Sequence, residues 1–256
     1  MKAVGIIPSR MNSTRFPGKA LAELCGTPMV LRVWNAAVKS GVLEKVFIAT
    51  DSPEIASVCD ANQVPVLMTS GQHENPTSRT AEAAAMVDAD YYVMLGGDEP
   101  LLHPDDIRRI VTEGIRQIEA KTAFVVNAMA DIPSPEEAGD SSNIKIICTA
   151  DGRGISAFRH PEDKPPSENH QPADDSHPRK LGQKFVSIGI YTKKALDFFT
   201  STAPGPEERR VHFDLLRFME HQRPVSFLRT AHRTLSVDTP KDYEKVVSIL
   251  QQTGTI

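Results

Sequence analysis

The stretch that decides the fold is KAVGIIPSRMNSTRFPGK, residues 2–19. Lys2–Pro8 is a short apolar run typical of a buried strand. The loop that follows carries Arg10, Arg15 and Lys19, separated by small hydroxyl and amide side chains. A triphosphate is bound by guanidinium forks, a lysine point charge and exposed backbone N–H groups. We therefore predict a phosphate-binding loop. Its spacing matches neither GxxxxGK[ST] nor GxGxxG, which disfavours a kinase-type phosphate loop and a dinucleotide-binding fold.

Apolar runs and amphipathic segments alternate through the rest of the first half. The predicted strands lie at 45–50, 64–68, 91–95 and 123–129, and the predicted helices at 28–40, from Ser52 onward, at 77–87 and at 107–118. Strand and helix in strict alternation predict an α/β fold, with a mostly parallel twisted sheet, flanking helices and right-handed crossovers. Ligands of such Rossmann-like sheets bind beyond the carboxyl ends of the strands.

The second half has a different pattern. A hairpin is predicted from 143–149 and 155–158 around a glycine-bearing turn. A strand at 184–191, helices near 193–200 and 207–221, a strand at 224–230 and a helix at 240–252 complete the chain. His160–Pro178 holds five prolines and five acidic residues, and we predict a mobile loop. Its three histidines, at 160, 170 and 177, have no spacing that fits a compact metal site.

Composition narrows the class of protein. The chain has 256 residues, 40% hydrophobic and 24% charged, with a net charge of −4, as in an ordinary globular protein. No global basic field would recruit nucleic acid, and no apolar run approaches the roughly 18–20 residues of a membrane span. Met1–Pro8 is too short for a signal peptide. The cysteines, Cys25, Cys59 and Cys148, are odd in number and lack CxxC spacing. We therefore expect a cytoplasmic protein.

Two aspartates stand at predicted strand ends. Asp98 follows the strand at 91–95 and two glycines, which let the backbone approach a ligand closely. Asp238 lies between a strand and a helix, with Thr239 as the expected N-cap and Pro240 as the first helical residue. Two such carboxylates can hold one Mg²⁺ together with substrate phosphates. For Asp238 alone, an equal alternative is that it offsets the helix macrodipole without any metal.

Several motifs together carry a family resemblance. They are the loop Pro8–Lys19, GDEP at 97–100, VDTP at 237–240, the segments 49–51, 68–70 and 189–191, and His73 and Arg79. In this order they resemble the 3-deoxy-manno-octulosonate cytidylyltransferases (CMP-Kdo synthetases) of the nucleotide-sugar transferase superfamily. The resemblance implies one nucleotidyltransferase domain over 1–256, with a smaller acceptor and dimerisation subdomain at about 131–200 that forms a homodimer. It also implies a reaction: CTP is joined to the anomeric hydroxyl of a 2-keto-3-deoxy sugar acid, giving a CMP-sugar and pyrophosphate.

The resemblance also assigns residues. Arg10, Lys19, Asp98 and Asp238 would be catalytic, and the two aspartates would hold Mg²⁺. The residues implied to bind the nucleotide are Pro8, Ser9, Arg10, Ser13, Arg15, Lys19, Thr77, Arg79, Gly96 and Gly97. Those implied to bind the acceptor are Arg159, Ser187, Tyr191 and Asp214.

The chain departs from the family pattern around the acceptor. Gly96 replaces a glutamine, Ser187 stands where a histidine is expected, and the segments 75–79 and 213–217 are altered. The phosphate and metal motifs are intact. Three hypotheses are therefore open: cytidylyl transfer to a Kdo-like acid, transfer with another nucleoside triphosphate or another anionic acceptor such as a sugar phosphate, and a non-catalytic nucleotide-sugar-binding relative. His73 is open as well, either a nucleotide contact or a solvated loop residue.

Overall fold

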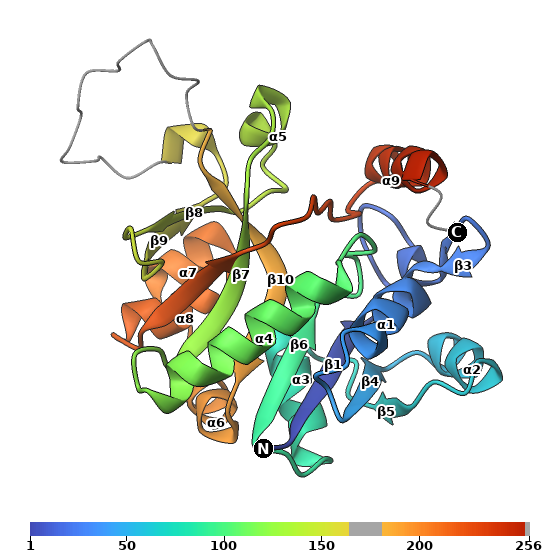
Figure 1. Ribbon diagram of the computed structural model, residues 1–256, viewed down its shortest axis with the longest axis horizontal. Helices are drawn as coiled ribbons and strands as arrows, with labels where there is room; N and C mark the ends of the chain where they lie inside the picture. Colours follow the sequence, from blue (N-terminus) through green and yellow to red (C-terminus); the bar gives the residue numbers. More distant parts are fainter. Residues whose placement is uncertain (164–180, 254–256) are drawn as a thin grey trace.

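A twisted sheet with strand order β11-β7-β10-β6-β1-β4-β5 forms the centre of the protein (Figure 1). The computed structural model describes residues 1–163 and 181–253. The strands are β1 (Ala3–Ser9), β4 (Lys45–Thr50), β5 (Val66–Met68), β6 (Tyr91–Leu95), β7 (Val125–Asp131), β10 (Gln183–Tyr191) and β11 (Val225–Arg229). β1 pairs in parallel with β4 and β6, β4 with β5, and β7 with β11. The predicted mostly parallel sheet is confirmed. The strand at β10 runs antiparallel to both its neighbours, β6 and β7.

Helices cover both faces of this sheet. One face is covered by α1 (Met29–Lys39), α2 (Pro53–Ala61) and α4 (Pro104–Glu119), and the other by α3 (Pro76–Ala85), α6 (Lys193–Ser201) and α8 (Leu215–Glu220). Within β1 the side chains alternate between the two cores, with Ile7 in the first and Val4 and Ile6 in the second. A third, smaller core packs α9 (Pro240–Thr253) against the amino-terminal segment, through Leu24, Met29 and Val246.

The helix starts follow from local sequence. Ser52 Oγ accepts a hydrogen bond from the Ile55 N–H at 3.2 Å, with Pro53 at the first helical position, as the sequence predicts. Before α3, Asn75 Oδ1 accepts the Ser78 N–H at 2.8 Å. These caps satisfy backbone donors that the first turn of a helix cannot pair internally. They also fix where the loops that follow β4 and β5 end.

Shorter elements complete the chain. β2 (Glu23–Leu24) and β3 (Thr27–Pro28) pair with each other after a turn of 3-10 helix, η1 (Lys19–Leu21). β8 (Lys145–Cys148) and β9 (Gly154–Phe158) form the predicted hairpin, which joins the sheet through β10. α5 (Pro135–Gly139) precedes this hairpin, and η2 (Pro161–Asp163) follows it. Of the predicted loop 160–178, residues 164–178 lie outside the described residues.

The single helix predicted over 207–221 is wrong. The structure has two short helices there, α7 (Pro206–Val211) and α8. His212 has φ of +54°, the left-handed conformation, so the i to i−4 ladder ends there. The prediction failed because both short helices bury apolar side chains, and Val211, Leu215 and Phe218 keep a helical spacing across the break.

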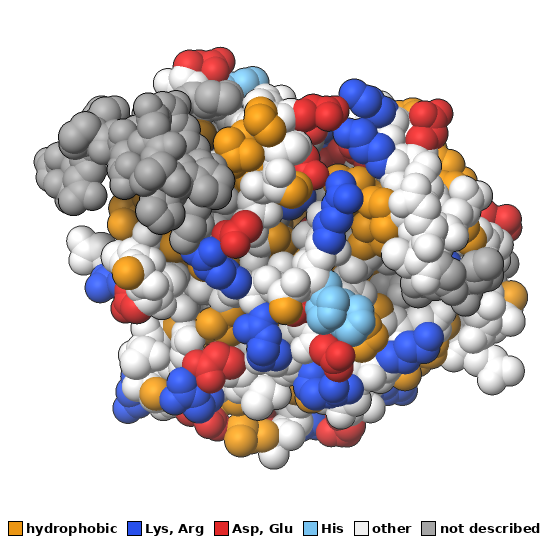
Figure 2. All heavy atoms as spheres, turned by 45° about the horizontal axis from the view of Figure 1, so that its top comes forward, with side chains coloured by type: hydrophobic (Ala, Val, Ile, Leu, Met, Phe, Trp, Pro, Cys, Tyr) orange, Lys and Arg blue, Asp and Glu red, His pale blue; other side chains and the backbone are white. Residues whose placement is uncertain are grey.

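The surface agrees with the modest net charge. On the face drawn in Figure 2, acidic and basic side chains are interspersed with hydrophobic ones. Among the described residues, no helix combines the length and the apolarity that crossing a membrane requires. Cys25, Cys59 and Cys148 are all free thiols.

Candidate active site

A cavity of about 290 Å³ opens beyond the carboxyl ends of β1 and β6. Its walls come from the loop after β1, the segment that leads into α3, the loop after β6, Ser187 of β10 and Asp238 before α9. Every predicted nucleotide-binding residue lines it except Thr77. The segments that follow these strands thus meet at one place, as expected for ligand sites at the carboxyl ends of strands in α/β sheets.

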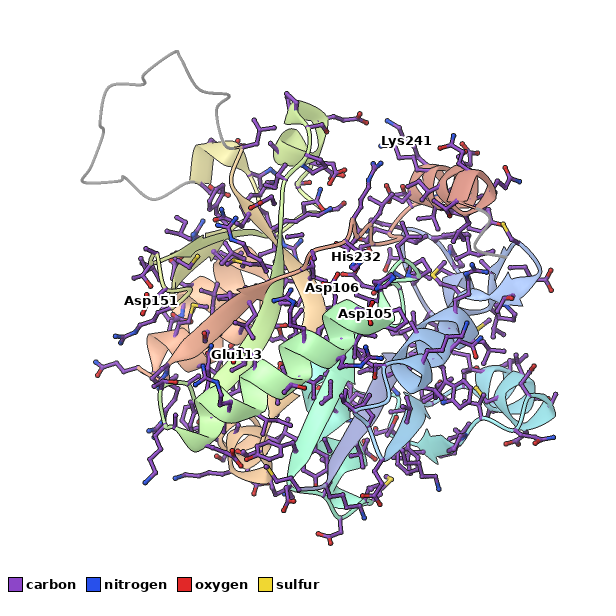
Figure 3. The ribbon with its side chains drawn as sticks, in the orientation of Figure 1. Asp105, Asp106, Glu113, Asp151, His232 and Lys241 are labelled. Atoms are coloured by element: carbon purple, nitrogen blue, oxygen red, sulfur yellow. The ribbon has the colours of Figure 1, made fainter. Side chains whose placement is uncertain are left out.

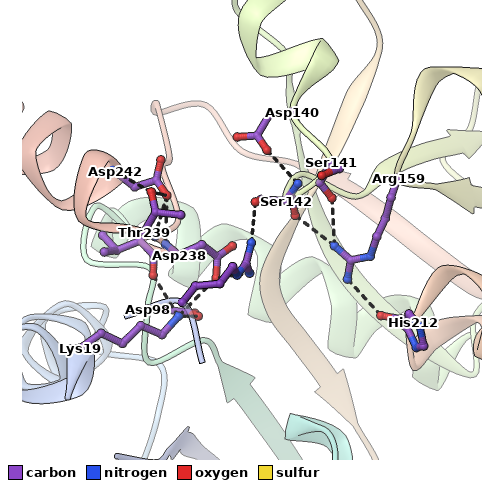
Figure 4. Close-up of polar contacts among 12 residues, drawn as sticks. Lys19, Asp98, Asp140, Ser141, Ser142, Arg159, His212, Asp238, Thr239 and Asp242 are labelled. Carbon is purple, nitrogen blue, oxygen red and sulfur yellow. Dashed lines mark hydrogen bonds and ion pairs between the residues drawn. The ribbon is translucent and has the colours of Figure 1, made fainter. Parts of the chain in front are cut away.

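Lys19 lies between the two aspartates (Figure 4). Its Nζ is 2.7 Å from Asp98 Oδ2 and 3.3 Å from Asp238 Oδ1, and it donates to the Val237 carbonyl at 2.9 Å. Burial would lower the pKa of Lys19, but the two carboxylates outweigh burial and raise it. The two acids therefore converge on a single cation, although 140 positions separate them in sequence (238 − 98 = 140).

Close backbone approach makes this convergence possible. A Cβ at position 97 would lie 2.6 Å from Ser9 Oγ and 3.0 Å from the Pro8 carbonyl oxygen, and Gly97 has none. Any larger residue would force the loops after β1 and β6 apart. The Val237 N–H donates to the Asp98 carbonyl at 2.8 Å, which ties the segment before α9 to the loop after β6.

The cavity keeps hydrogen-bond donors that the protein itself leaves uncommitted. Arg10 is exposed, and its side chain has no hydrogen bond or ion pair with any described residue. The buried Ser9 Oγ likewise has no hydrogen-bond partner in the described part of the chain. Arg15 is committed instead, because it pairs with Asp238 at 2.9 Å and donates to Ser142 Oγ at 2.6 Å. A positive, donor-rich wall of this kind suits a phosphate group.

Hydrogen bonds and ion pairs fix the part of the cavity wall formed by the segment before α3 and by the first turn of α3. Arg79 is buried, donates to Thr69 Oγ1 at 2.7 Å and lies 3.1 Å from Asp51 Oδ1. His73 lines the cavity with only 15% of its side chain exposed. Its Nδ1 is 3.1 Å from Ser78 Oγ, and its Nε2 contacts Glu82. His73 is therefore a fixed part of the wall rather than a solvated loop residue.

Ser187 and Gly96 meet at the floor of the cavity. The Gly96 N–H donates to the Ser187 carbonyl at 2.9 Å, and a Cβ on Gly96 would lie 2.6 Å from Ser187 Cβ. The Ser187 N–H in turn donates to Glu99 Oε1 at 3.1 Å. Burial raises the pKa of Glu99 to about 7. Sequence reasoning did not single out Glu99, because an acid next to Asp98 carries no local sign that it points inward.

Four residues with predicted ligand contacts do not line the cavity. Arg159 donates to backbone carbonyls, among them that of Val211 at 2.7 Å. Figure 4 shows another of these bonds, to the His212 carbonyl at 3.0 Å. Thr77 Oγ1 donates to Asp214 Oδ2 at 2.6 Å, and Tyr191 is fully buried. Burial raises the pKa of both Asp214 and Tyr191. Thr77 and Asp214 thus bond to each other, Arg159 bonds to the backbone, and the buried Tyr191 hydroxyl has no hydrogen-bond partner among the described residues. Contact of these four side chains with a ligand stays a prediction.

The side chains that could ligate a metal ion indicate which ion suits the cavity. The described residues contain no group of three or more His, Cys, Asp or Glu side chains that could hold a metal ion. That excludes a dedicated protein cage within residues 1–163 and 181–253. Asp98 and Asp238 instead offer two hard carboxylate ligands around one position that a cation already holds. This set fits Mg²⁺, which binds through one or two carboxylates plus substrate phosphates.

Comparison with known proteins agrees with this geometry. Residues 4–253 match the family described as cytidylyltransferase. The chain belongs to this family. The 3-deoxy-manno-octulosonate cytidylyltransferase of Geobacter metallireducens is 34% identical, over 98% of this chain and 99% of the relative. That of Oleidesulfovibrio alaskensis is 32% identical, over 97% and 96%. The predicted family is therefore confirmed.

Solved structures agree on the fold. A CMP:2-keto-3-deoxy-manno-octonic acid synthetase complexed with CTP matches with a TM-score of 0.85 at 28% identity, over 99% of this cytidylyltransferase and 100% of the synthetase. A putative glucose-1-phosphate thymidylyltransferase from Bacillus anthracis matches with a TM-score of 0.68 at 14% identity, over 96% and 94% of the two chains. The second match shows a shared fold alone.

Proposed function

We propose that this protein transfers the cytidylyl group of CTP to 3-deoxy-manno-octulosonate, a 2-keto-3-deoxy sugar acid, and releases pyrophosphate. The observation that carries the proposal is the convergence of Arg10, Lys19, Asp98 and Asp238 in one cavity. The names of the relatives supply the substrates, and the CTP complex of the similar synthetase supports CTP as the donor.

The chemistry follows from charge and alignment. The anomeric hydroxyl attacks the α-phosphorus of CTP, the new C–O–P linkage forms, and the bond to the bridging oxygen of pyrophosphate breaks as the hydroxyl proton is lost. Both reactants are anions, so cations must offset their repulsion and the charge on the leaving pyrophosphate. The uncommitted Arg10 and the partly buried ammonium of Lys19 are suited to the triphosphate. No covalent enzyme intermediate is required, because alignment supplies much of the rate.

The proposal includes Mg²⁺. Asp98 and Asp238 would hold the ion, which would supply charge neutralisation at the phosphate oxygens. Lys19 balances the charge of the two carboxylates and keeps them together. The resemblance to the family further supports a homodimer, and the three free thiols suit a reducing compartment such as the cytoplasm.

A second candidate concerns the acceptor. Gly96 and Ser187 line the cavity floor and place no charged side chain there. These two small residues lie beside the Asp98 carboxylate, whose Oδ1 would be 3.1 Å from a Cβ on Gly96. This arrangement favours a related anionic acceptor whose charge lies away from this part of the wall, with the same cytidylyl transfer.

The test is release of pyrophosphate by the purified protein with CTP, Mg²⁺ and a panel of acceptors. The panel contains 3-deoxy-manno-octulosonate, related 2-keto-3-deoxy acids and sugar phosphates. Thermal shifts with ATP, GTP, UTP and CTP identify the donor. Turnover with 3-deoxy-manno-octulosonate supports the first candidate, and turnover with another acid alone supports the second. Stabilisation by CTP without pyrophosphate release from any acceptor would favour a non-catalytic relative.

A further inference from the structure

The segment that delivers Asp238 has no regular secondary structure. Residues 230–239, here called the crossing segment, run from the end of β11 to the start of α9 (Figure 1). Such a segment lacks the ladder of hydrogen bonds that fixes a strand or helix. Leu235 and Val237 bury apolar side chains in the third core, but apolar contact is non-directional and tolerates sliding. Directional contacts must therefore set where Asp238 lies.

Asp106 supplies the first of these contacts from α4. Its carboxylate is almost fully buried, and the side chain is only 2% exposed. Oδ1 accepts the Ala231 N–H at 2.7 Å, and Oδ2 accepts the His232 N–H at 2.9 Å. The His232 ring adds Nδ1 at 3.0 Å and stacks on the His103 ring, with centroids 3.6 Å apart. Figure 3 shows Asp106 and His232 side by side where the crossing segment passes α4.

Lys184 of β10 supplies a second contact further along the segment. Its Nζ donates to the Thr234 carbonyl at 3.2 Å and to Glu137 Oε2 at 2.6 Å. Both charged side chains are nearly buried, with 5% and 10% exposed. In the third contact, the Val237 N–H donates a hydrogen bond to the Asp98 carbonyl at 2.8 Å. The segment is thus held at 231–232, 234 and 237, in the residues that immediately precede Asp238.

We propose that Asp106 and Lys184 are positioning residues, which fix the crossing segment so that the Asp238 carboxylate faces Asp98 and together they present one divalent-cation site. The inference rests on the proposed function for its metal. Neither residue lines the cavity. Both act through the backbone of the crossing segment, so losing either weakens Mg²⁺ binding more than it slows the chemistry at saturating Mg²⁺.

The first test compares Asp106→Asn with Asp105→Asn. Asp105 is the adjacent acid in the same helical turn, but its side chain is 62% exposed and pairs with Arg108. Asn at 106 turns one acceptor into a donor, so the Ala231 and His232 N–H groups cannot both be satisfied. Charged hydrogen bonds of this kind correspond to roughly tenfold or more in an equilibrium. We expect about tenfold faster hydrogen exchange of amides 231–237 and about a tenfold higher half-saturating Mg²⁺ concentration. Asp105→Asn should leave both at the wild-type value.

A second variant covers the case in which Asp106→Asn fails to fold. The double change Lys184→Met, Glu137→Gln removes the Thr234 contact without leaving a buried charge unpaired. This double variant should speed hydrogen exchange around Thr234 and raise the half-saturating Mg²⁺ concentration, as Asp106→Asn does. A merely structural role would lower the amount of active protein and leave the half-saturating Mg²⁺ concentration unchanged.

Two outcomes separate the inference from the function on which it rests. If exchange and Mg²⁺ requirement in the folded variants equal those of the wild type, Asp106 and Lys184 do not position Asp238. If the wild type releases no pyrophosphate, the proposed function fails. The inference is then judged by exchange and by calorimetric affinity for CTP with and without Mg²⁺. Loss of the Mg²⁺-dependent gain in CTP affinity in Asp106→Asn, but not in Asp105→Asn, supports the inference, and retention in Asp106→Asn overturns it.

Discussion

Neutralising Asp98 or Asp238 separates what these acids do for catalysis from what they do for stability. Asp238 pairs with Arg15 at 2.9 Å and with Lys19 at 3.3 Å, and the Arg15 side chain is 51% exposed. The Arg15–Asp238 pair, which is open to solvent on the arginine side, contributes about 0–1 kcal/mol. The Lys19–Asp238 pair is more shielded, with side chains 16% and 20% exposed, but it is the longer of the two contacts that Lys19 makes with a carboxylate. In Asp238→Asn, Lys19 also keeps its 2.7 Å contact with Asp98. We therefore expect the free energy of unfolding to fall by no more than about 1 kcal/mol.

The expected effect on turnover is much larger. Each acid supplies one of the two carboxylates proposed to hold Mg²⁺ against the transferring phosphate. Loss of a comparable group that stabilises developing charge costs about 3–4 kcal/mol, or roughly 10²–10³ in kcat. Asp98→Asn and Asp238→Asn should each show this loss, and raising Mg²⁺ should restore only part of it.

The assay pairs steady-state pyrophosphate release with urea denaturation of the same preparations. Glu244→Gln, an exposed acid on α9, is the matched control and should change neither. Wild-type turnover in both aspartate variants would refute the metal assignment. A drop in unfolding free energy of 3–4 kcal/mol would refute the division between structure and catalysis, because unfolding would then account for the lost activity.

Arg10, Arg217 and Asp106 each give a further testable expectation. Arg10→Ala should raise the KM for CTP about 10- to 100-fold in initial-rate assays and leave the melting temperature unchanged, because Arg10 has no partner among the described residues; an unchanged KM would exclude a phosphate contact. Arg217 is buried against both carboxylate oxygens of Glu208 at 2.6 and 2.8 Å, so Arg217→Met should cost about 3–5 kcal/mol in urea denaturation; adding Glu208→Leu should recover much of that loss, and no recovery would contradict the charge argument. Burial would raise the pKa of Asp106, but the N–H groups of Ala231 and His232 and the His232 ring hold it below its usual range. The contribution of Asp106 to the stability of the folded protein is therefore complete above the usual Asp pKa and is lost as pH falls through the lower pKa of the folded state. Asp106→Asn should make the free energy of unfolding fall less steeply with decreasing pH. An equally steep fall in the variant would contradict the role given to Asp106.

Much of the fold and part of the site were predictable because their signals are local. The spacing of apolar residues indicates the helices and strands, and nearby residues indicate where they begin and end. Ser52 with Pro53 marks the start of α2, and Gly41, with φ of +72°, follows the end of α1. Residues that directly follow strands, such as Arg10 and Asp98, could be assigned to the ligand-binding edge by the same local reading.

Other features carry no local signal. The antiparallel direction of β10, the left-handed His212 that divides α7 from α8, and the buried side of Glu99 depend on which elements pack together. Asp106 and Asp105 are indistinguishable in sequence, yet one is buried beneath the crossing segment and the other faces solvent.

The amino-acid sequence alone determined the family and the α/β class, and it predicted which residues bind a triphosphate, since propensity, capping and motif order are properties of neighbouring residues. Only the tertiary structure decided that Lys19, Asp98 and Asp238 share one point in space. It also decided that Arg159, Thr77, Tyr191 and Asp214 stand outside the cavity wall. The physical reason is that contacts between distant segments form only when the whole sheet and its helices bury their apolar faces together.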